Sequence, residues 1–237
     1  MASLDFYLTI EHPCSYFSER ASRNIIPNPE YPMHANIYSQ LIQNGFRRSG
    51  SGIYRPACKN CTDCHPSRLR IHDFKFTRQY KRCLKRNQDI QLELKPAEYT
   101  DEYFQLYERY LNTRHEDGGM SNPQKEDFTR FLYSEWSDTS FLTMRLNDQL
   151  VGVAVIDHSS DGLSAVYTFF DPTLAQRSLG KFAILQQIKL CEELKHPYLY
   201  LGYWIPECKK MQYKADYQPL ECFTPEQGWQ EQTLPQK

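Results

Sequence analysis

The stretch from which we predict the fold of this chain is "TSFLTMRLNDQLVGVAVIDHSSDGLSAVYTFFD", residues 139–171. Its apolar segments 139–146, 149–158 and 163–171 are separated by two short polar stretches. Asn147-Asp148 and the Ser-Ser-Asp-Gly stretch at 159–162 are typical of tight turns between antiparallel strands. The segment therefore predicts a meander of three β-strands.

The sequence after the meander predicts a helix and another strand. "RSLGKFAILQQIKLCEELK" at 177–195 has the apolar spacing of a long amphipathic helix, and "YLYLGYW" at 198–204 has the composition of a strand. The residues expected to face inward from the helix are Phe182, Leu185, Ile188 and Leu194.

The sequence before the meander predicts a strand and two helices. "IQLEL" at 90–94 alternates like a strand, and Thr100 is the expected N-cap of a helix. Asn122 and Pro123 predict the start of a second helix, as N-cap and first helical residue. The face of the first helix expected to pack in the core contains Tyr103, Leu106, Tyr107, Tyr110 and Leu111.

The order of these elements is that of the GNAT acyltransferases, in which two helices and three strands precede a strand, loop, helix and strand unit. We therefore expect an α+β protein with a GNAT-like domain over residues 96–237. Residues 1–95 would form a smaller, cysteine-containing α/β region. That region should contain a strand around 4–8 and a helix over "NIYSQLIQN" that ends at Gly45.

The loop "RSLGKF" at 177–182 resembles half of the phosphate-binding loop of GNAT enzymes, Arg-x-x-Gly-x-Gly/Ala. Phe182 stands where a small residue would let the backbone approach a phosphate. This departure disfavours a coenzyme A dependent N-acetyltransferase, which remains an alternative. The loop is equally typical of a tight helix start.

The charge is distributed unevenly along the chain. The whole protein has a net charge of -1, whereas residues 45–87 contain twelve Arg or Lys and two Asp, a net +10. A basic stretch of this kind suits a polyanion such as RNA, and the alternative for "RQYKRCLKRN" is a solvated helix face. With no long apolar run and an acidic N-terminal stretch, "MASLDFYLTIEHP", the sequence predicts a cytoplasmic location.

A cysteine cluster lies within the basic stretch. Cys58, Cys61 and Cys64 have the Cys-x-x-Cys-x-x-Cys spacing that lets thiolates converge on one metal, and Cys14 is a candidate fourth ligand. A structural zinc site and an iron-sulfur cluster both fit this spacing, and reduced structural thiols are the alternative. His12 and His65 are candidate substitute ligands; Cys83, Cys191, Cys208 and Cys222 are expected to be packing residues.

Several long segments, in order, resemble the bacterial aspartate/glutamate leucyltransferases, relatives of the arginyl-tRNA protein transferases. They are "FYLTIEHPCSYFSERAS", "GFRRSGSGIYRPACKNCTDCHPSRLRI", "YLNTRHEDGGM", "GVAVIDHSSDGLSAVYTFFDP" and "YLYLGYWIPECKKMQYKADYQPLE". The resemblance implies transfer of leucine from leucyl-tRNA to the N-terminal amine of proteins that begin with Asp or Glu. Such transfer marks proteins for degradation in the N-degron pathway and needs no cofactor.

The resemblance also implies partners and a point of departure. Leucyl-tRNA and acidic N-termini would be the partners, without a membrane or DNA. Eukaryotic relatives begin the cysteine motif with Cys-Gly-Tyr-Cys, whereas this chain has Cys14-Ser15-Tyr16-Phe17. Arginine as the donated residue and a non-enzymatic metal-dependent RNA-binding module remain alternatives.

The reaction would be an attack of an amine on an activated ester, and candidate residues follow from that chemistry. In a GNAT-like sheet the amine meets the acyl group beside the strand before the glycine loop, so Asp171 and Tyr167 are the catalytic candidates. A local cap is the alternative role for Asp171. His115 is a weaker candidate base.

The remaining candidates are cationic or line the glycine loop. The residues expected to contact aminoacyl-tRNA are Arg177, Gly180, Lys181, Arg78, Lys81 and Arg82. Because a bidentate arginine suits a carboxylate best, the residues expected to recognise an N-terminal Asp or Glu are Arg47, Arg48 and Arg55, with tRNA contact as the alternative.

Overall fold

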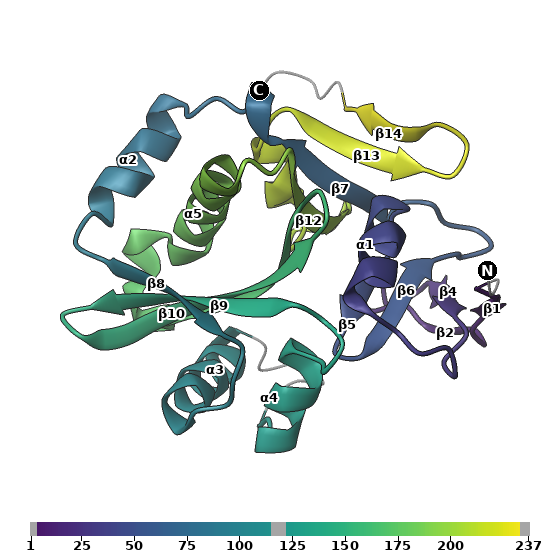
Figure 1. The fold of residues 1–237 in the computed structure, drawn as a ribbon, viewed down its shortest axis with the longest axis horizontal. Helices are drawn as coiled ribbons and strands as arrows, with labels where there is room; N and C mark the ends of the chain where they lie inside the picture. The colour runs from purple at the N-terminus through teal and green to yellow at the C-terminus, as the bar shows by residue number, and fades with distance from the viewer. Residues whose placement is uncertain (1–3, 115–121, 233–237) are drawn as a thin grey trace.

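An eight-stranded mixed sheet organises the protein (Figure 1). The computed structural model describes residues 4–114 and 122–232. The strand order is β14-β13-β7-β12-β11-β10-β9-β8, and only β11 and β12 run parallel. The strands are β7 (His65–Arg70), β8 (Gln91–Pro96), β9 (Thr139–Leu146), β10 (Gln149–Ser159), β11 (Gly162–Phe170), β12 (Tyr198–Trp204), β13 (Leu220–Thr224) and β14 (Gly228–Glu231).

The predicted meander is confirmed as β9, β10 and β11. Asn147 and Asp148 both have positive φ, as the tight turn between β9 and β10 requires. β10 is buried along nearly its whole length because helices cover both faces of the sheet at this point. Together with β12 parallel to β11, the meander gives the expected α+β, GNAT-like arrangement.

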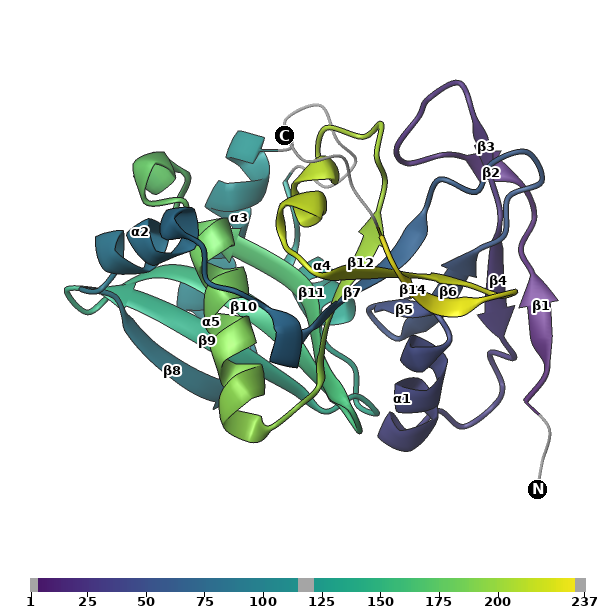
Figure 2. The same cartoon turned by 90° about the horizontal axis from the view of Figure 1, so that it is seen from above.

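Two helices cover each face of the sheet (Figure 2). On one face lie α2 (Arg78–Arg86) and α5 (Leu179–Leu194), and on the other lie α3 (Asp101–Arg114) and α4 (Lys125–Leu132). In α5, Phe182, Leu185 and Ile188 are buried as predicted. Leu194 is 46% exposed, so its predicted inward position was wrong: it is the last residue of the helix, next to the left-handed Lys195.

The starts of α3 and α4 differ in how well the sequence predicted them. Thr100 caps α3 as expected, because its hydroxyl accepts from the backbone N–H of Tyr103 at 3.1 Å. The predicted start of α4 at Asn122 and Pro123 was wrong. Gln124 is the N-cap and forms a capping box with Asp127, which supplies the stronger start signal.

The N-terminal region adds a second sheet, α1 (Ala35–Gln43) and a small hairpin. The sheet has the order β1-β4-β6-β5, with β1 (Phe6–Leu8), β4 (Asn24–Pro27), β6 (Gly52–Pro56) and β5 (Arg47–Ser49). The hairpin joins β2 (His12–Pro13) to β3 (Ala21–Ser22), and α1 ends before Gly45 as predicted. Three 3₁₀ helices complete the fold of the described residues: η1 (Ile71–Asp73), η2 (Pro172–Arg177) and η3 (Gln212–Asp216).

The expected boundary near residue 95 does not separate two sheets. β7 lies between β12 and β13, and β8 pairs with β9, so the large sheet takes strands from both sides of that boundary. Buried ion pairs add to this connection: Arg48 of β5 pairs with Asp157 of β10, and Arg68 of β7 with Glu221 of β13. In the described ranges, no helix combines the length and apolarity that a membrane crossing requires.

Candidate active site

The strands β11 and β12 part from each other shortly after they begin. Their pairing covers only Gly162–Ser164 and Tyr198–Tyr200. Beyond that point the guanidinium of Arg47 bridges the gap. It donates to the carbonyl of Leu201 on β12 at 3.4 Å and to the carbonyls of Ala165 and Val166 on β11 at 3.3 and 3.0 Å. A side chain thus replaces the missing strand-to-strand hydrogen bonds.

Gly202 makes room for this guanidinium. A Cβ at residue 202 would lie 1.2 Å from Nη1 of Arg47, and the glycine has a φ of +79°. Only a residue without a side chain combines this backbone conformation with such a close approach. We call the place where β11 and β12 diverge around Arg47 the strand fork.

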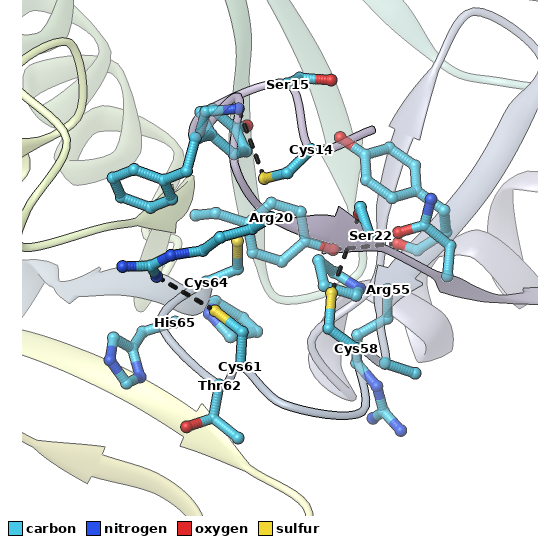
Figure 3. A pocket seen from close by; sticks show the side chains of 18 of the residues that line it. Cys14, Ser15, Arg20, Ser22, Arg55, Cys58, Cys61, Thr62, Cys64 and His65 are labelled. Carbon is cyan, nitrogen blue, oxygen red and sulfur yellow. Dashed lines mark hydrogen bonds between the residues drawn. The ribbon is translucent and has the colours of Figure 1, made fainter. Parts of the chain in front are cut away.

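A cavity of about 640 Å³ lies between the N-terminal region and the large sheet. All four cysteines predicted as metal ligands, Cys14, Cys58, Cys61 and Cys64, line it (Figure 3). Aromatic rings from several elements form much of its wall, namely Tyr16, Phe17, Tyr54, Tyr203 and Phe223. The tertiary fold therefore brings Cys14 to the Cys-x-x-Cys-x-x-Cys segment, as the sequence predicted.

We call this cavity the cysteine pocket. Its four thiols are the kind of donor that zinc or an iron-sulfur cluster binds, but their side chains are not arranged as a ligand shell. Cys61 accepts from Arg20 at 3.6 Å, and Cys58 donates to the Ser22 hydroxyl at 3.8 Å. Burial, followed by the neighbouring cysteines, raises the pKa of Cys64 to about 12. Within residues 4–114 and 122–232, no three His, Cys, Asp or Glu side chains are placed to hold a metal ion.

Tyr167, a predicted catalytic residue, presents an unused hydroxyl. Its ring packs between β11 and the helices α3 and α4, against Phe131 at 5.1 Å and Tyr107 at 6.3 Å. The hydroxyl oxygen is buried and lacks a hydrogen-bond partner among the described residues. Because burial raises the pKa of Tyr167, the phenol stays protonated and can donate a hydrogen bond.

Asp171, the other catalytic candidate, is held as a local cap. Its carboxylate accepts from the backbone N–H of Thr173 at 2.9 Å and from the Thr173 hydroxyl at 2.6 Å, at the start of η2. This is the alternative role that the sequence left open. The second carboxylate oxygen has no hydrogen bond within the described part of the chain, so a role in catalysis stays a prediction.

The three arginines expected to recognise an acidic N-terminus occupy different environments. Arg48 has a fully buried side chain and forms a bidentate ion pair with Asp157, with both hydrogen bonds at 2.6 Å. It cannot meet a substrate, so a recognition role for Arg48 does not fit the structure. Arg55 lines the cysteine pocket and lies over the ring of Phe46 at 4.8 Å, and Arg47 spans the strand fork. These two remain candidates.

The residues predicted to contact tRNA divide into exposed and paired cations. Arg78, Lys81 and Arg82 are exposed on α2, and none has an ion pair within the described residues. Arg177 instead forms a bidentate ion pair with Asp89, with hydrogen bonds of 2.8 and 2.9 Å, which connects η2 to the end of α2. This pairing gives Arg177 a structural role and leaves a phosphate contact as a prediction.

Gly180 and Lys181 lie in the first turn of α5. A Cβ at Gly180 would approach the ring of Phe170 to 3.2 Å, so the glycine serves helix packing here. Phe182, the residue that breaks the coenzyme-binding pattern, is buried in the core against which α5 packs. Burial raises the pKa of Cys83 on α2, and the positive charge of Lys181 opposes this rise. Lys181 therefore lies near the basic helix. His115 lies outside the described residues.

Sequence reasoning missed Lys214 on η3. This lysine is only 3% exposed, and its ammonium donates to the carbonyl of Tyr203 at 2.6 Å. Burial, and then the charge of Arg47, lowers its pKa well below the usual range. The surrounding "MQYKADY" has an aromatic residue on each side of the lysine but no periodicity that predicts burial.

Comparison with known proteins adds to this geometry. Residues 12–82 match the family described as arginine-tRNA-protein transferase, N terminus, and residues 102–224 match arginine-tRNA-protein transferase, C terminus. A solved structure of L-PGS from Bacillus licheniformis is similar to this chain with a TM-score of 0.45 and 10% identity. The similar region covers 60% of this chain and 45% of the L-PGS chain.

Curated relatives match over nearly their whole length. The chain is 47% identical to the aspartate/glutamate leucyltransferase of Alcanivorax borkumensis, over 99% of this chain and 97% of the relative. The enzymes of the same name from Saccharophagus degradans and Pseudomonas savastanoi pv. phaseolicola are 44% and 45% identical. These two matches cover 93% and 97% of this chain and 94% and 97% of the relatives. With both parts of the family matched in order along one chain, the protein belongs to the arginine-tRNA-protein transferase family.

Proposed function

We propose that this protein transfers leucine from leucyl-tRNA to the N-terminal amine of proteins that begin with Asp or Glu. The observation that supports this most strongly is the 47% identity, over 99% of the chain, with a relative named aspartate/glutamate leucyltransferase. An enzyme of this kind needs a surface for a polyanion, a cation for an acidic residue and a place where the amine meets an ester. The exposed side of α2, the strand fork and the neighbouring Tyr167 offer these features.

The reaction is a simple exchange of bonds. The neutral α-amine attacks the carbonyl carbon of the aminoacyl ester, a C–N bond forms, and the bond from that carbon to the ribose oxygen breaks. The amine loses a proton, and the ribose hydroxyl leaves with one, so no redox partner or nucleotide is consumed. Since an α-amine has a pKa of about 7.7 to 8.0, positioning of its neutral form contributes much of the rate.

Tyr167 is suited to the oxygen side of this exchange. Its protonated hydroxyl is a donor without a partner among the described residues, and hydrogen bonds to an oxygen that gains charge in the transition state are worth more in a dry site than in water. Asp171 would orient or accept the amine proton through its second carboxylate oxygen. Its first oxygen is already committed to Thr173.

The tRNA would lie along α2 and the start of α5. Arg78, Lys81 and Arg82 point outward from a helix whose Tyr80 and Cys83 are buried, so the helix is anchored on one side and cationic on the other. Contacts of this type neutralise phosphates and release counterions, which makes binding depend on salt. Binding to aminoacyl-tRNA also suggests a cytoplasmic location and a role in the N-degron pathway.

The coenzyme A alternative receives less support. The carbonyls of Ala165 and Val166 at the strand fork are taken by Arg47, and the first turn of α5 packs Gly180 against Phe170. Phe182 is buried directly after that turn. These contacts, with a bulky residue where the coenzyme-binding pattern has a small one, disfavour a pyrophosphate at this loop.

The four cysteines keep their predicted role as ligands of zinc or of an iron-sulfur cluster. Cys14, Cys58, Cys61 and Cys64 supply the thiolate donors that such a group prefers. When bound, the group would fix the segment 58–64 against the β2–β3 hairpin. Metal analysis of protein purified without oxygen tests this, with Cys61→Ser as the variant expected to lower metal content.

A transfer assay tests the proposed function. Labelled leucine and, separately, labelled arginine are presented on charged tRNA with reporters that begin with Asp, Glu, Lys or Ala. We expect leucine on the Asp and Glu reporters alone, and only while the tRNA is intact. Transfer of arginine to these reporters would show that arginyl-tRNA, and not leucyl-tRNA, is the donor. No transfer from either tRNA by the folded protein would overturn the proposal.

A further inference from the structure

Phe170, the last residue of β11, is a phenyl ring that stays partly exposed where the strand ends. A Cβ at Gly180, in the first turn of α5, would lie 3.2 Å from this ring. Glycine weakens a helix, and at this position the absent side chain gives the ring its room. The fold thus accepts a poor helix residue in order to hold a partly exposed ring at this point.

Two side chains of α3 complete the surroundings of this ring. The ring centroid of Tyr110 lies 5.0 Å from that of Phe170 and 6.3 Å from that of Tyr167. Arg114, the last residue of α3, holds its guanidinium over Phe170, 5.7 Å from the ring centroid. The charge of Arg114 also opposes the rise in the pKa of Tyr110 that burial causes. A row of rings therefore leads from the buried hydroxyl of Tyr167 to a ring that lies beneath a cation.

Arg114 is not committed to an acid within the described residues. Its side chain is exposed, and none of the ion pairs among those residues includes it. Carbon atoms in van der Waals contact lie about 3.5 to 4.0 Å apart, so the guanidinium at 5.7 Å stands off the ring. Because the side chain is long and exposed, it can move outward to admit a flat group. A phenyl ring on one side and a guanidinium on the other are the surfaces on which unpaired nucleobases stack.

Phe170 is also joined to the basic helix α2. One residue separates it from η2, which ends at Arg177, and Arg177 pairs with Asp89 at 2.8 and 2.9 Å. Arg86 of α2 donates to the carbonyl of Gln176 at 2.5 Å. A nucleic acid strand whose phosphates contact the exposed face of α2 would therefore reach Phe170 by crossing η2.

The reacting ester limits where the last base of the tRNA can lie. In an aminoacyl-tRNA the amino acid is esterified to the ribose of the terminal adenosine, so the adenine is one sugar away from the ester. With the ester beside Tyr167, the adenine must meet a surface within reach of that residue. Phe170 lies three residues further along β11, and both residues contact the ring of Tyr110.

We propose that Phe170 is the stacking surface for the terminal adenine of the aminoacyl-tRNA, with the guanidinium of Arg114 on the opposite face of the base. This inference rests on the function proposed above. The order along the site is then phosphates on α2, adenine at Phe170 and ester at Tyr167. Stacking of this kind selects an unpaired base at the 3′ end, whereas the cations of α2 recognise phosphates of any sequence.

The test compares uncharged tRNA that has its complete 3′ end with the same tRNA trimmed of the terminal adenosine. Filter binding at one salt concentration gives the affinity of each for wild type, Phe170→Leu and the matched control Phe104→Leu. Phe104 is also partly exposed, but it packs at the start of α3 against Tyr99 and Phe128. We expect wild type to prefer the complete tRNA by about 5- to 150-fold, the range for stacking of one base on an aromatic ring. The preference should fall at least about fivefold in F170L and stay at the wild-type value in F104L.

The preference for the complete tRNA decides the outcome. Equal binding of complete and trimmed tRNA by the wild type would overturn the proposal, and so would an unchanged preference in folded F170L. If F170L does not fold, Arg114→Lys takes its place, because lysine keeps the charge and loses the flat guanidinium. An undiminished preference in R114K would then have the same meaning.

This binding measurement does not depend on transfer, so the two proposals can fail separately. If no reporter receives leucine, the proposed function fails, while a preference that is lost in F170L would still support the adenine site at Phe170. If leucine is transferred but wild type binds both tRNAs equally, the proposed function stands and the adenine site is overturned.

Discussion

Arg47 and Arg48 are neighbours on β5 but lie in opposite electrostatic situations. Arg48 is sealed in the interior with Asp157, which also accepts from Tyr38 and Thr139 at 3.0 and 2.7 Å. Arg47 reaches the strand fork and, among the described residues, donates only to backbone carbonyls. Successive residues of a strand point to opposite faces, so one Arg-Arg pair can join two parts of the fold and also supply an unpaired cation. The difference separates a charge used for structure from one available for a ligand.

The largest effect should come from breaking the buried ion pair between Arg48 and Asp157. Asp157→Asn leaves Arg48 charged and buried without a counterion, and we expect a loss of about 3 to 5 kcal/mol in the free energy of unfolding. Urea unfolding measures it. Asp138→Asn, at an exposed site directly before β9, is the control and should change stability little. A loss in D157N no greater than in D138N would mean that the pair adds nothing to stability.

The exposed cations of α2, which have no ion pair in the described part of the chain, provide the next contrast. Replacing Arg78, Lys81 and Arg82 together by Gln should leave stability unchanged but weaken tRNA binding. The slope of log affinity against log salt should fall by roughly 2 to 3, since each phosphate contact contributes about 0.7 to 0.9. Filter binding at several salt concentrations measures it. An unchanged slope would show that α2 has a solvated face and no tRNA contact.

The unpartnered hydroxyl of Tyr167 extends the comparison to a neutral group. Tyr167→Phe removes a buried donor that satisfies nothing in the described structure, so we expect stability to be equal or slightly higher. If the hydroxyl stabilises the reacting ester oxygen, kcat should fall by about tenfold or more. Tyr107→Phe, at another ring that contacts Tyr167, is the control for packing. A kcat for Y167F equal to that of the control would remove Tyr167 from the reaction.

The smallest effect should come from an exposed pair. Arg177 lowers the pKa of the Asp89 carboxyl by hydrogen bonding, so the pair stabilises the fold above the usual aspartate pKa and loses this contribution as the pH falls. Asp89→Asn should therefore differ slightly from wild type in melting temperature at pH 7, and the difference should shrink below about pH 4. A difference that is constant with pH would show that the charge of Asp89 is not its source.

Local patterns predicted the elements of the fold well. Alternation and turn residues identified the meander, and a single threonine identified the start of α3. The start of α4 was missed because Asn122 and Pro123 imitate a helix start two residues before the real capping box. The boundary near residue 95 stays a prediction. The sequence did not indicate that the large sheet takes strands from both sides of it, because strand order depends on contacts between distant segments, which no local pattern encodes.

The candidate site was predicted only in part for the same reason. Cys14 could be joined to the later cysteines by its residue type, and the structure places all four on one pocket. The arginines 47, 48 and 55 were equivalent in sequence. Their separation depends on Asp157, on Gly202 and on Phe46, which lie on different elements.

The family, the meander, the amphipathic helices and the basic stretch could be predicted without the structure, because they follow from residue types at short range. Which charges are paired depends on how distant segments fold together. Burial and distance set the energy of a charge, and both arise when segments such as β5, β10 and η3 pack together. Lys214 appears in the sequence as one lysine among many, and the fold buries its amine without an acidic partner in the described chain, which lowers its pKa well below the usual range.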